Sequence, residues 1–211
     1  MSGKSNDSLV LSYLSLRRSV GVIGITLPFV LAFGKIFLEG PGIQTSISAY
    51  YYTVMRGVFV GALWAIGVFL YSYHGYERQD DIAGDLACAF AIGTALFPTT
   101  PSLATELQMM IGRFHLAFAA SFFLTLAYFA LVLFRKTNQN GNMTKKKRQR
   151  NMVYTICGCT IIACIVLIAL LKIAPQYFPV SQLTPVFWLE ALAIFSFGFS
   201  WFVKGEAILA D

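Results

Sequence analysis

Long apolar runs separated by short connections constrain the fold of this chain more than any other feature of its sequence. Only 12% of its 211 residues are charged and 57% are hydrophobic, whereas a soluble domain has roughly 25% charged residues. A helix needs about 20 apolar residues to cross a bilayer, and six runs approach that length: 20–38, 53–73, 82–97, 112–134, 152–173 and 185–203. The sequence therefore predicts an all-α polytopic integral membrane protein, a six-transmembrane-helix bundle that forms a single domain over residues 1–211.

Basic residues indicate how this bundle is oriented. The net charge of +6 is concentrated in the stretch FRKTNQNGNMTKKKRQRN, residues 134–151. The positive-inside rule places such a segment on the cytoplasmic side. With six spans, both termini then also lie in the cytoplasm, in agreement with Arg17, Arg18 and Lys204. We expect residues 1–19 to form a cytoplasmic N-terminal segment with a short helix along the membrane surface, and 135–151 to form a basic cytoplasmic loop.

Other interpretations of these two regions are open. The basic loop is typical of a topology determinant that also contacts anionic membrane lipids, and a dedicated lipid-sensing or nucleic-acid role is the less favoured alternative. We predict membrane lipids as partners and no nucleic acid, and oligomerisation is left open. The first apolar run could also be a cleaved signal peptide. Its removal would leave five helices, which fits the basic residues at the two ends of the chain less well.

Small residues predict how the helices pack. Ala83, Ala87, Ala91 and Ala95 recur every four residues in the third run, and small side chains permit close helix approach inside a membrane. We therefore expect the third helix at the centre of the bundle. Gly57 and Gly61 form a second candidate close-packing pair, and the tryptophans at 188 and 201 are expected in the two interfacial belts.

Ionisable residues within the apolar runs are the candidate functional groups, because charges in the hydrocarbon region usually face the bundle interior or a wet cavity. On the predicted topology, four of them share the outer leaflet. We expect Glu190 to pair with Arg56 or Arg113, and three consecutive tyrosines to rim the same opening with their hydroxyls in water. The predicted cluster consists of Arg56, Arg113, His115, Glu190, Tyr50, Tyr51 and Tyr52.

This cluster has two interpretations. One is an outward-facing polar pocket for a small anionic ligand or a lipid headgroup, favoured by two arginines and a histidine against one carboxylate. The other is an interhelical ion pair that fixes helix register beside an ordinary aromatic belt. Asp85 lies near the inner side, where it is either an acid stabilised by the helix dipole or the inner end of an ion or proton path.

Motifs for known catalysis are missing from the sequence. His74 and His115 are expected at opposite ends of the membrane, so they cannot share a metal, and no zinc, phosphate-loop or serine-hydrolase motif occurs. The four cysteines contain no C-x-x-C pair. We predict no metal site, no cofactor and no assigned catalytic residue.

The segments SISAYYYTVMRGVFVG, ALFPTTP and FGFSWFVKGE resemble a family of small uncharacterised bacterial multi-pass membrane proteins. The resemblance implies an integral protein of the bacterial cytoplasmic membrane and carries over no functional residue. The leading expectation is a protein that binds or passes a small anionic ligand through an outer pocket. The alternatives are a membrane enzyme acting on a lipid headgroup, with Glu190 or His115 as acid–base, and a structural or regulatory subunit without a ligand.

Overall fold

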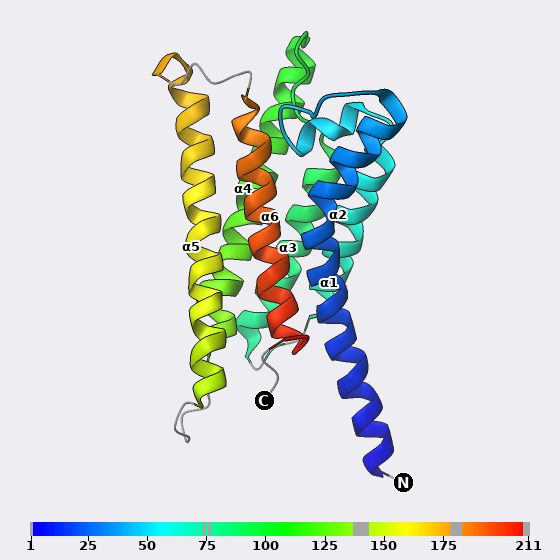
Figure 1. Ribbon diagram of the computed structural model, residues 1–211, viewed down its shortest axis with the longest axis vertical. Helices are drawn as coiled ribbons and strands as arrows, with labels where there is room; N and C mark the ends of the chain where they lie inside the picture. Colours follow the sequence, from blue (N-terminus) through cyan, green and yellow to red (C-terminus); the bar gives the residue numbers. More distant parts are fainter. Residues whose placement is uncertain (1, 74, 76, 137–143, 178–182, 209–211) are drawn as a thin grey trace.

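The regular structure in this computed structural model is helical, and no strand occurs in the residues it describes. Those residues are 2–73, 75, 77–136, 144–177 and 183–208, and for 2–13 and 175 only the backbone is described. The α-helices are α1 Ser2–Glu39, α2 Arg56–Tyr71, α3 Arg78–Leu96, α4 Glu106–Leu131, α5 Lys145–Ile173 and α6 Pro185–Lys204. Three short 3₁₀ helices accompany them: η1 Ser48–Tyr52, η2 Leu133–Arg135 and η3 Pro175–Tyr177. Successive α-helices run antiparallel, so α1 begins and α6 ends at the same end of the bundle (Figure 1).

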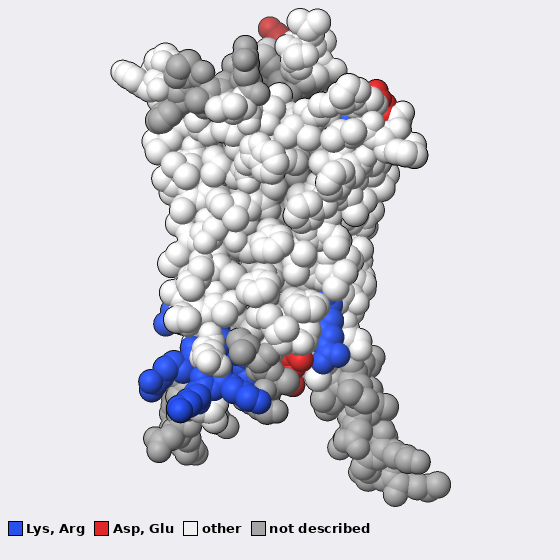
Figure 2. Space-filling view, viewed as in Figure 1, with Lys and Arg blue, Asp and Glu red and all other residues white. Residues whose placement is uncertain are grey.

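Four of these helices are long and apolar enough to cross a membrane, which confirms the all-α prediction and indicates a membrane location. They span Leu14–Glu39, Glu106–Arg135, Lys145–Ile173 and Pro185–Lys204. The apolar helix α2 is shorter, at 16 residues, and α3 carries four charged residues in its first half. Figure 2 shows a broad middle zone without charged atoms, and basic side chains gathered at the lower end.

Local signals explain where the helices begin. Thr105 caps α4: its hydroxyl accepts a hydrogen bond from the backbone of Gln108, whose side chain accepts one from the Thr105 backbone in return. Thr144 caps α5 in a similar way by accepting from the Lys147 backbone at 3.1 Å. Pro185 opens α6, where its missing N–H costs nothing.

The start of α5 and the course of α1 both differ from the prediction. The basic residues 145–150 form the first turns of α5, not a loop, while 137–143 lie outside the described residues. At the other terminus, α1 runs as one helix from Ser2 to Glu39. The expected separate helix along the membrane surface is therefore wrong, because no break divides residues 2–19 from the apolar span.

The α-helices form a ring. Helices α2 to α5 pack mainly on their neighbours in sequence, whereas α1 packs mainly on α6, which closes the ring. Half of the apolar window of α6 is buried, compared with a third or less for α1, α4 and α5. The four alanines of the predicted repeat in α3 are buried, whereas Ala89 is exposed. Nevertheless, α3 packs chiefly between α2 and α4, so the prediction that it occupies the centre of the bundle is wrong.

Glycines on α1 and α6 create a close helix crossing. A Cβ atom at Gly198 would lie 2.6 Å from the Ile25 nitrogen, and one at Gly21 would lie 2.7 Å from the Phe202 nitrogen. Such distances are too short for any side chain, so the two backbones touch directly. Gly57 and Gly61 of α2, the predicted close-packing pair, make no such backbone contact. A Cβ at either position would meet nothing within 4 Å.

Aromatic rings fill the bundle between the last turns of α6 and the neighbouring helices. The ring of Trp201 is buried, with 1% of the residue exposed, and packs on Tyr73, Phe129 and Phe134 at centroid distances of 5.1–5.6 Å. Trp188 is 60% exposed and suits an interfacial belt. The prediction that both tryptophans lie in such belts is therefore wrong for Trp201, which is a core residue.

Candidate functional site

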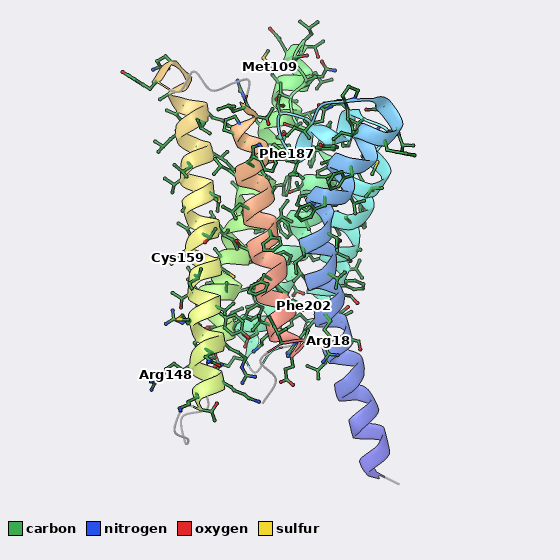
Figure 3. All side chains as sticks on the ribbon, in the orientation of Figure 1. Arg18, Met109, Arg148, Cys159, Phe187 and Phe202 are labelled. Carbon is green, nitrogen blue, oxygen red and sulfur yellow. The ribbon has the colours of Figure 1, made fainter. Side chains whose placement is uncertain are left out.

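A polar cavity of about 220 Å³ opens at the end of the bundle where α1 ends and α6 begins. We call this end the cavity end; Figure 3 labels Phe187 of α6 near it. Helices α4, α5 and α6 form the walls, and two loops, 40–55 and 97–105, close over them. The lining residues are Ser46, Ser48, Thr99, Thr100, Gly112, Arg113, His115, Leu116, Ala119, Ile168, Lys172 and Glu190.

The two loops are held in place by specific contacts. The hydroxyl of Tyr52 donates to the backbone oxygen of Thr99 at 2.6 Å, which ties the first loop to the second. A Cβ at Gly112 would overlap Thr100 Oγ1 and lie 2.9 Å from the Thr100 nitrogen. Only glycine therefore lets the second loop approach α4 closely enough to form this side of the cavity.

Glu190 joins α6 to the first loop. Its Oε2 atom accepts hydrogen bonds from the backbone N–H groups of Ile47 at 2.6 Å and Ser48 at 3.4 Å. Its Oε1 atom has no hydrogen-bond partner among the described residues. Glu190 thus holds the start of η1 while it presents a carboxylate oxygen to the cavity.

His115 is buried, and its ring is oriented by the end of α3. The Nδ1 atom lies 2.7 Å from the backbone oxygen of Phe97 and 3.2 Å from that of Thr94. Carbonyl oxygens only accept hydrogen bonds, so Nδ1 carries the proton and Nε2 is left as the acceptor of the neutral ring. His115 therefore satisfies carbonyl groups left unpaired at the end of α3 and also contributes to the cavity wall.

Two cations, Arg113 and Lys172, complete the polar lining. Both side chains are exposed, and neither has a hydrogen bond or an ion pair with any residue that the structure describes. Together they place two positive charges against the single carboxylate of Glu190. The cavity therefore carries an excess of positive charge and enough room for several water molecules.

The cavity narrows beyond Glu190, toward the middle of the bundle. A second cavity of about 30 Å³ lies there and has a mostly apolar lining that includes Phe59, Phe122 and Phe197. Ser48, Ala119 and Glu190 line both cavities. A volume of this size holds at most about one or two water molecules, and apolar walls keep such spaces dry. The polar lining therefore stops near the level of Glu190.

Arg113, His115 and Glu190 meet in one cavity, but Arg56 and the tyrosines do not line it. Arg56 lies over the ring of Tyr51, 4.0 Å from its centroid, and donates a hydrogen bond to the Tyr51 hydroxyl. The expected ion pair of Glu190 with Arg56 or Arg113 is therefore not formed among the described residues. Tyr50 is fully buried, so the expectation that all three tyrosine hydroxyls face water is wrong for this residue.

Asp85 also lies apart from the cavity. Its side chain is exposed on the second turn of α3. The buried acid in this part of the molecule is Asp80, which accepts a hydrogen bond from Lys136 at 3.2 Å. The described residues therefore show no polar path from Glu190 to Asp85.

Sequence reasoning missed Lys172 and the hydroxyl groups of the two loops. The signal for Lys172 was present, because it is a lone cation in the last turn of α5, directly after the uncharged stretch 152–171. The described residues contain no cluster of three or more His, Cys, Asp or Glu side chains suited to a metal ion, and His74 lies outside them. Comparison with family models, with curated proteins and with solved structures finds no match to this chain.

Proposed function

We propose that this protein is an integral membrane protein of a bacterial cytoplasmic membrane in which all six α-helices cross the bilayer. Helices α2 and α3 lie between α1 and α4 in the ring, so they share the depth of the four longer apolar helices. We call the end opposite the cavity, which carries Arg17, Arg18, Lys147, Arg150 and Lys204, the basic end. The basic end faces the cytoplasm under the positive-inside rule, and the cavity then faces outward. The resemblance to small bacterial multi-pass membrane proteins is the reason for proposing a bacterial membrane.

We further propose that the cavity binds a small anion or an anionic headgroup. The observation that carries this proposal is the pair of cations, Arg113 and Lys172, which line the space without a partner among the described residues. The one carboxylate there, Glu190, already accepts two backbone hydrogen bonds. An incoming anion would therefore find hydrogen-bond donors and excess positive charge, and hydrogen bonds between charged groups are stronger than those between neutral groups.

The narrowing below Glu190 favours binding over passage across the membrane. A conducting path needs polar or wet surface along its length, whereas the next space inward is small and apolar. An enzyme acting on a lipid headgroup would need a nucleophile or a metal beside His115 or Glu190. The hydroxyl of Ser46 is one candidate nucleophile in this region. It accepts a hydrogen bond from the Ala49 backbone at 3.0 Å and so stabilises the first loop.

Anion binding can be tested on the purified full-length chain in a zwitterionic detergent. The melting temperature is measured against rising chloride, sulfate, phosphate and acetate at constant ionic strength. We expect at least one anion to stabilise the parent protein in a saturable way. Arg113→Met and Lys172→Met should each weaken that binding by about tenfold, because a hydrogen bond to a charged group contributes about 1.5–3 kcal/mol.

Arg148→Met is the matched control. It removes the same charge from an exposed position on α5 at the opposite end, where Figure 3 shows the side chain pointing away from the bundle. It should leave anion binding unchanged. If no anion shifts the melting temperature, or if the control weakens binding as much as the cavity variants, the proposed site is wrong.

A further inference from the structure

One oxygen of the Glu190 carboxylate is left without a hydrogen-bond donor. The Oε2 atom accepts from the backbone N–H groups of Ile47 and Ser48 at 2.6 and 3.4 Å, whereas Oε1 has no donor among the described residues. Glu190 lines the polar cavity, so a solute in that cavity can reach it. An enclosed carboxylate oxygen is stabilised by a donor, and most strongly by a cationic one. The cavity therefore offers a place for a donor as well as for an anion.

Charges of opposite sign face this cavity from different helices. Arg113 belongs to α4 and Lys172 to α5, whereas Glu190 belongs to α6. Neither cation forms an ion pair with Glu190 in the part of the chain that the structure describes. The opposite charges therefore stay apart on the walls of one cavity. A solute that carries both a negative and a positive group would complement both kinds of charge at once.

His115 adds a further acceptor to the lining. Its Nδ1 atom is 2.7 Å from the backbone oxygen of Phe97, so the neutral ring keeps Nε2 as an acceptor. His115 is 4% exposed and lines the cavity, and Nε2 has no donor among the residues that the structure describes. An ammonium group carries three N–H donors and no acceptor. It is therefore the ligand group that best suits a lining with spare acceptors.

The small apolar cavity beyond Glu190 suits a short aliphatic group. It has a volume of about 30 Å³ and shares Ser48, Ala119 and Glu190 with the polar cavity, so the two spaces meet at these residues. Its remaining walls are mostly apolar and include Phe59 and Phe122. A space with such walls takes an apolar group more readily than water. An aliphatic side chain attached to a charged solute could therefore extend from the polar cavity into it.

We propose that the cavity binds a zwitterionic amino acid with a short aliphatic side chain. Its carboxylate binds to Arg113 and Lys172, its ammonium group donates to Glu190 Oε1, and its side chain enters the apolar cavity. This inference rests on the proposed anion site and deepens it, because it names the class of solute to which the anionic group belongs. A simple anion would satisfy the two cations alone and would leave Glu190 Oε1 without a donor.

The test compares L-alanine with its two charged halves on the purified full-length chain. Propionate lacks the ammonium group, and ethylamine lacks the carboxylate. The melting temperature is measured against rising concentrations of each solute in an uncharged detergent at constant ionic strength. We expect L-alanine to raise the melting temperature in a saturable way. It should bind about tenfold or more tightly than either half, because each half lacks one charged hydrogen-bonding group.

Glu190→Gln should change the binding of L-alanine and propionate in opposite directions. L-alanine should bind about tenfold more weakly, because its ammonium group loses a charged acceptor. Propionate should bind a few-fold more tightly, because a negative charge is removed from the lining, and this gain also shows that the variant is folded. Arg148→Met is the control at an exposed position on α5 near the opposite end and should change neither affinity.

Glycine tests the role of the apolar cavity, because it carries the same two charged groups without a side chain. L-alanine should bind about fourfold more tightly than glycine, as expected for the burial of one additional CH₂ group. Equal binding of glycine and L-alanine would overturn the placement of the side chain in the apolar cavity.

The outcomes separate the zwitterion site from the anion site on which it rests. Propionate binding as tight as that of L-alanine would overturn the zwitterion site and leave the anion site standing, and so would equal losses of both solutes in Glu190→Gln. Saturable binding of neither L-alanine nor any simple anion would overturn both. Binding of L-alanine without binding of any simple anion would support the zwitterion site and overturn a site for simple anions.

Discussion

The cavity end and the basic end both contain charged side chains that apolar helices bring together, yet they use them differently. At the cavity end, Arg113 and Lys172 line a space of about 220 Å³ without a partner among the described residues. Toward the basic end, the interior is filled by the rings around Trp201, and the acid Asp80 is buried against Lys136. Charge alone therefore does not mark a ligand site in this bundle. The difference lies in whether neighbouring side chains fill the space between the charges.

The largest effect should come from the aromatic packing near the basic end. Trp201→Ala is expected to reduce the free energy of unfolding by about 3–5 kcal/mol, because it leaves a large void among rings that cannot collapse. Trp188→Ala is the matched control at an exposed position and should change stability by about 0.5 kcal/mol or less. Chemical unfolding in detergent micelles measures both. Equal costs would mean that the two ends of α6 are packed alike, contrary to the difference in exposure between Trp201 and Trp188.

A smaller loss of stability should follow from breaking the ion pair between Asp80 and Lys136. Asp80→Asn is expected to cost about 2–3 kcal/mol, less than a fully buried pair because Lys136 is partly exposed. Adding Lys136→Met should recover part of that loss. Asp85→Asn is the exposed control on the same helix and should have almost no effect on the unfolding free energy.

The stability that the Asp80–Lys136 ion pair contributes should depend on pH in a defined way. Partial desolvation opposes the charge on Lys136, but its hydrogen bonds to Glu77 and Asp80 outweigh this and raise the pKa of its ammonium above the ordinary value. A raised pKa means that the stabilisation is complete below the unfolded-state pKa of about 10.4 and is lost only as the pH rises through the higher folded-state value. The cost of Asp80→Asn should therefore be the same at about pH 7 and about pH 9. A cost that falls across this interval would contradict the assigned pair.

At the cavity end, a substitution that pushes the 97–105 loop away from α4 should affect anion binding more than stability. Gly112→Ala is expected to cost about 1–2 kcal/mol because its Cβ would overlap Thr100, and to weaken anion binding by displacing the loop. Gly61→Ala is the control, since a Cβ there meets nothing within 4 Å. A melt and an anion titration on each variant give both quantities. Unchanged anion binding in Gly112→Ala would show that this loop does not shape the site.

The smallest effect on stability should come from Glu190. Glu190→Gln keeps an oxygen that can accept from the Ile47 backbone, so we expect a loss of about 1 kcal/mol or less. Anion affinity should rise a few-fold, because the only negative charge among the lining residues is removed. Arg56→Met should not alter either result, since Arg56 lies on Tyr51. A rescue of Glu190→Gln by Arg56→Met would reveal a coupling that the structure does not contain.

Several site residues could be placed from the sequence because helix ends fix their depth. Arg113 and His115 lie near the start of α4, and Glu190 lies near the start of α6, so antiparallel helices bring these residues to one end. Lys172 escaped the same reasoning, although its place in the last turn of α5 follows the same rule. Arg56 has a similar depth, but η1 and the Tyr51 ring hold it away from the cavity. Depth is therefore readable from the sequence, whereas the direction of a side chain around its helix is not.

The sequence by itself determined the all-α class, the four long apolar helices and the buried alanine repeat of α3, because apolar residues and small-residue spacing are properties of local segments. Only the tertiary structure decided that Trp201 is buried while Trp188 is exposed, and that Gly198 makes a backbone contact while Gly61 faces open space. In a soluble protein, polar and apolar faces would separate such positions. Lipid and protein interior are equally apolar, so hydropathy cannot distinguish a side chain that faces the membrane from one that faces another helix.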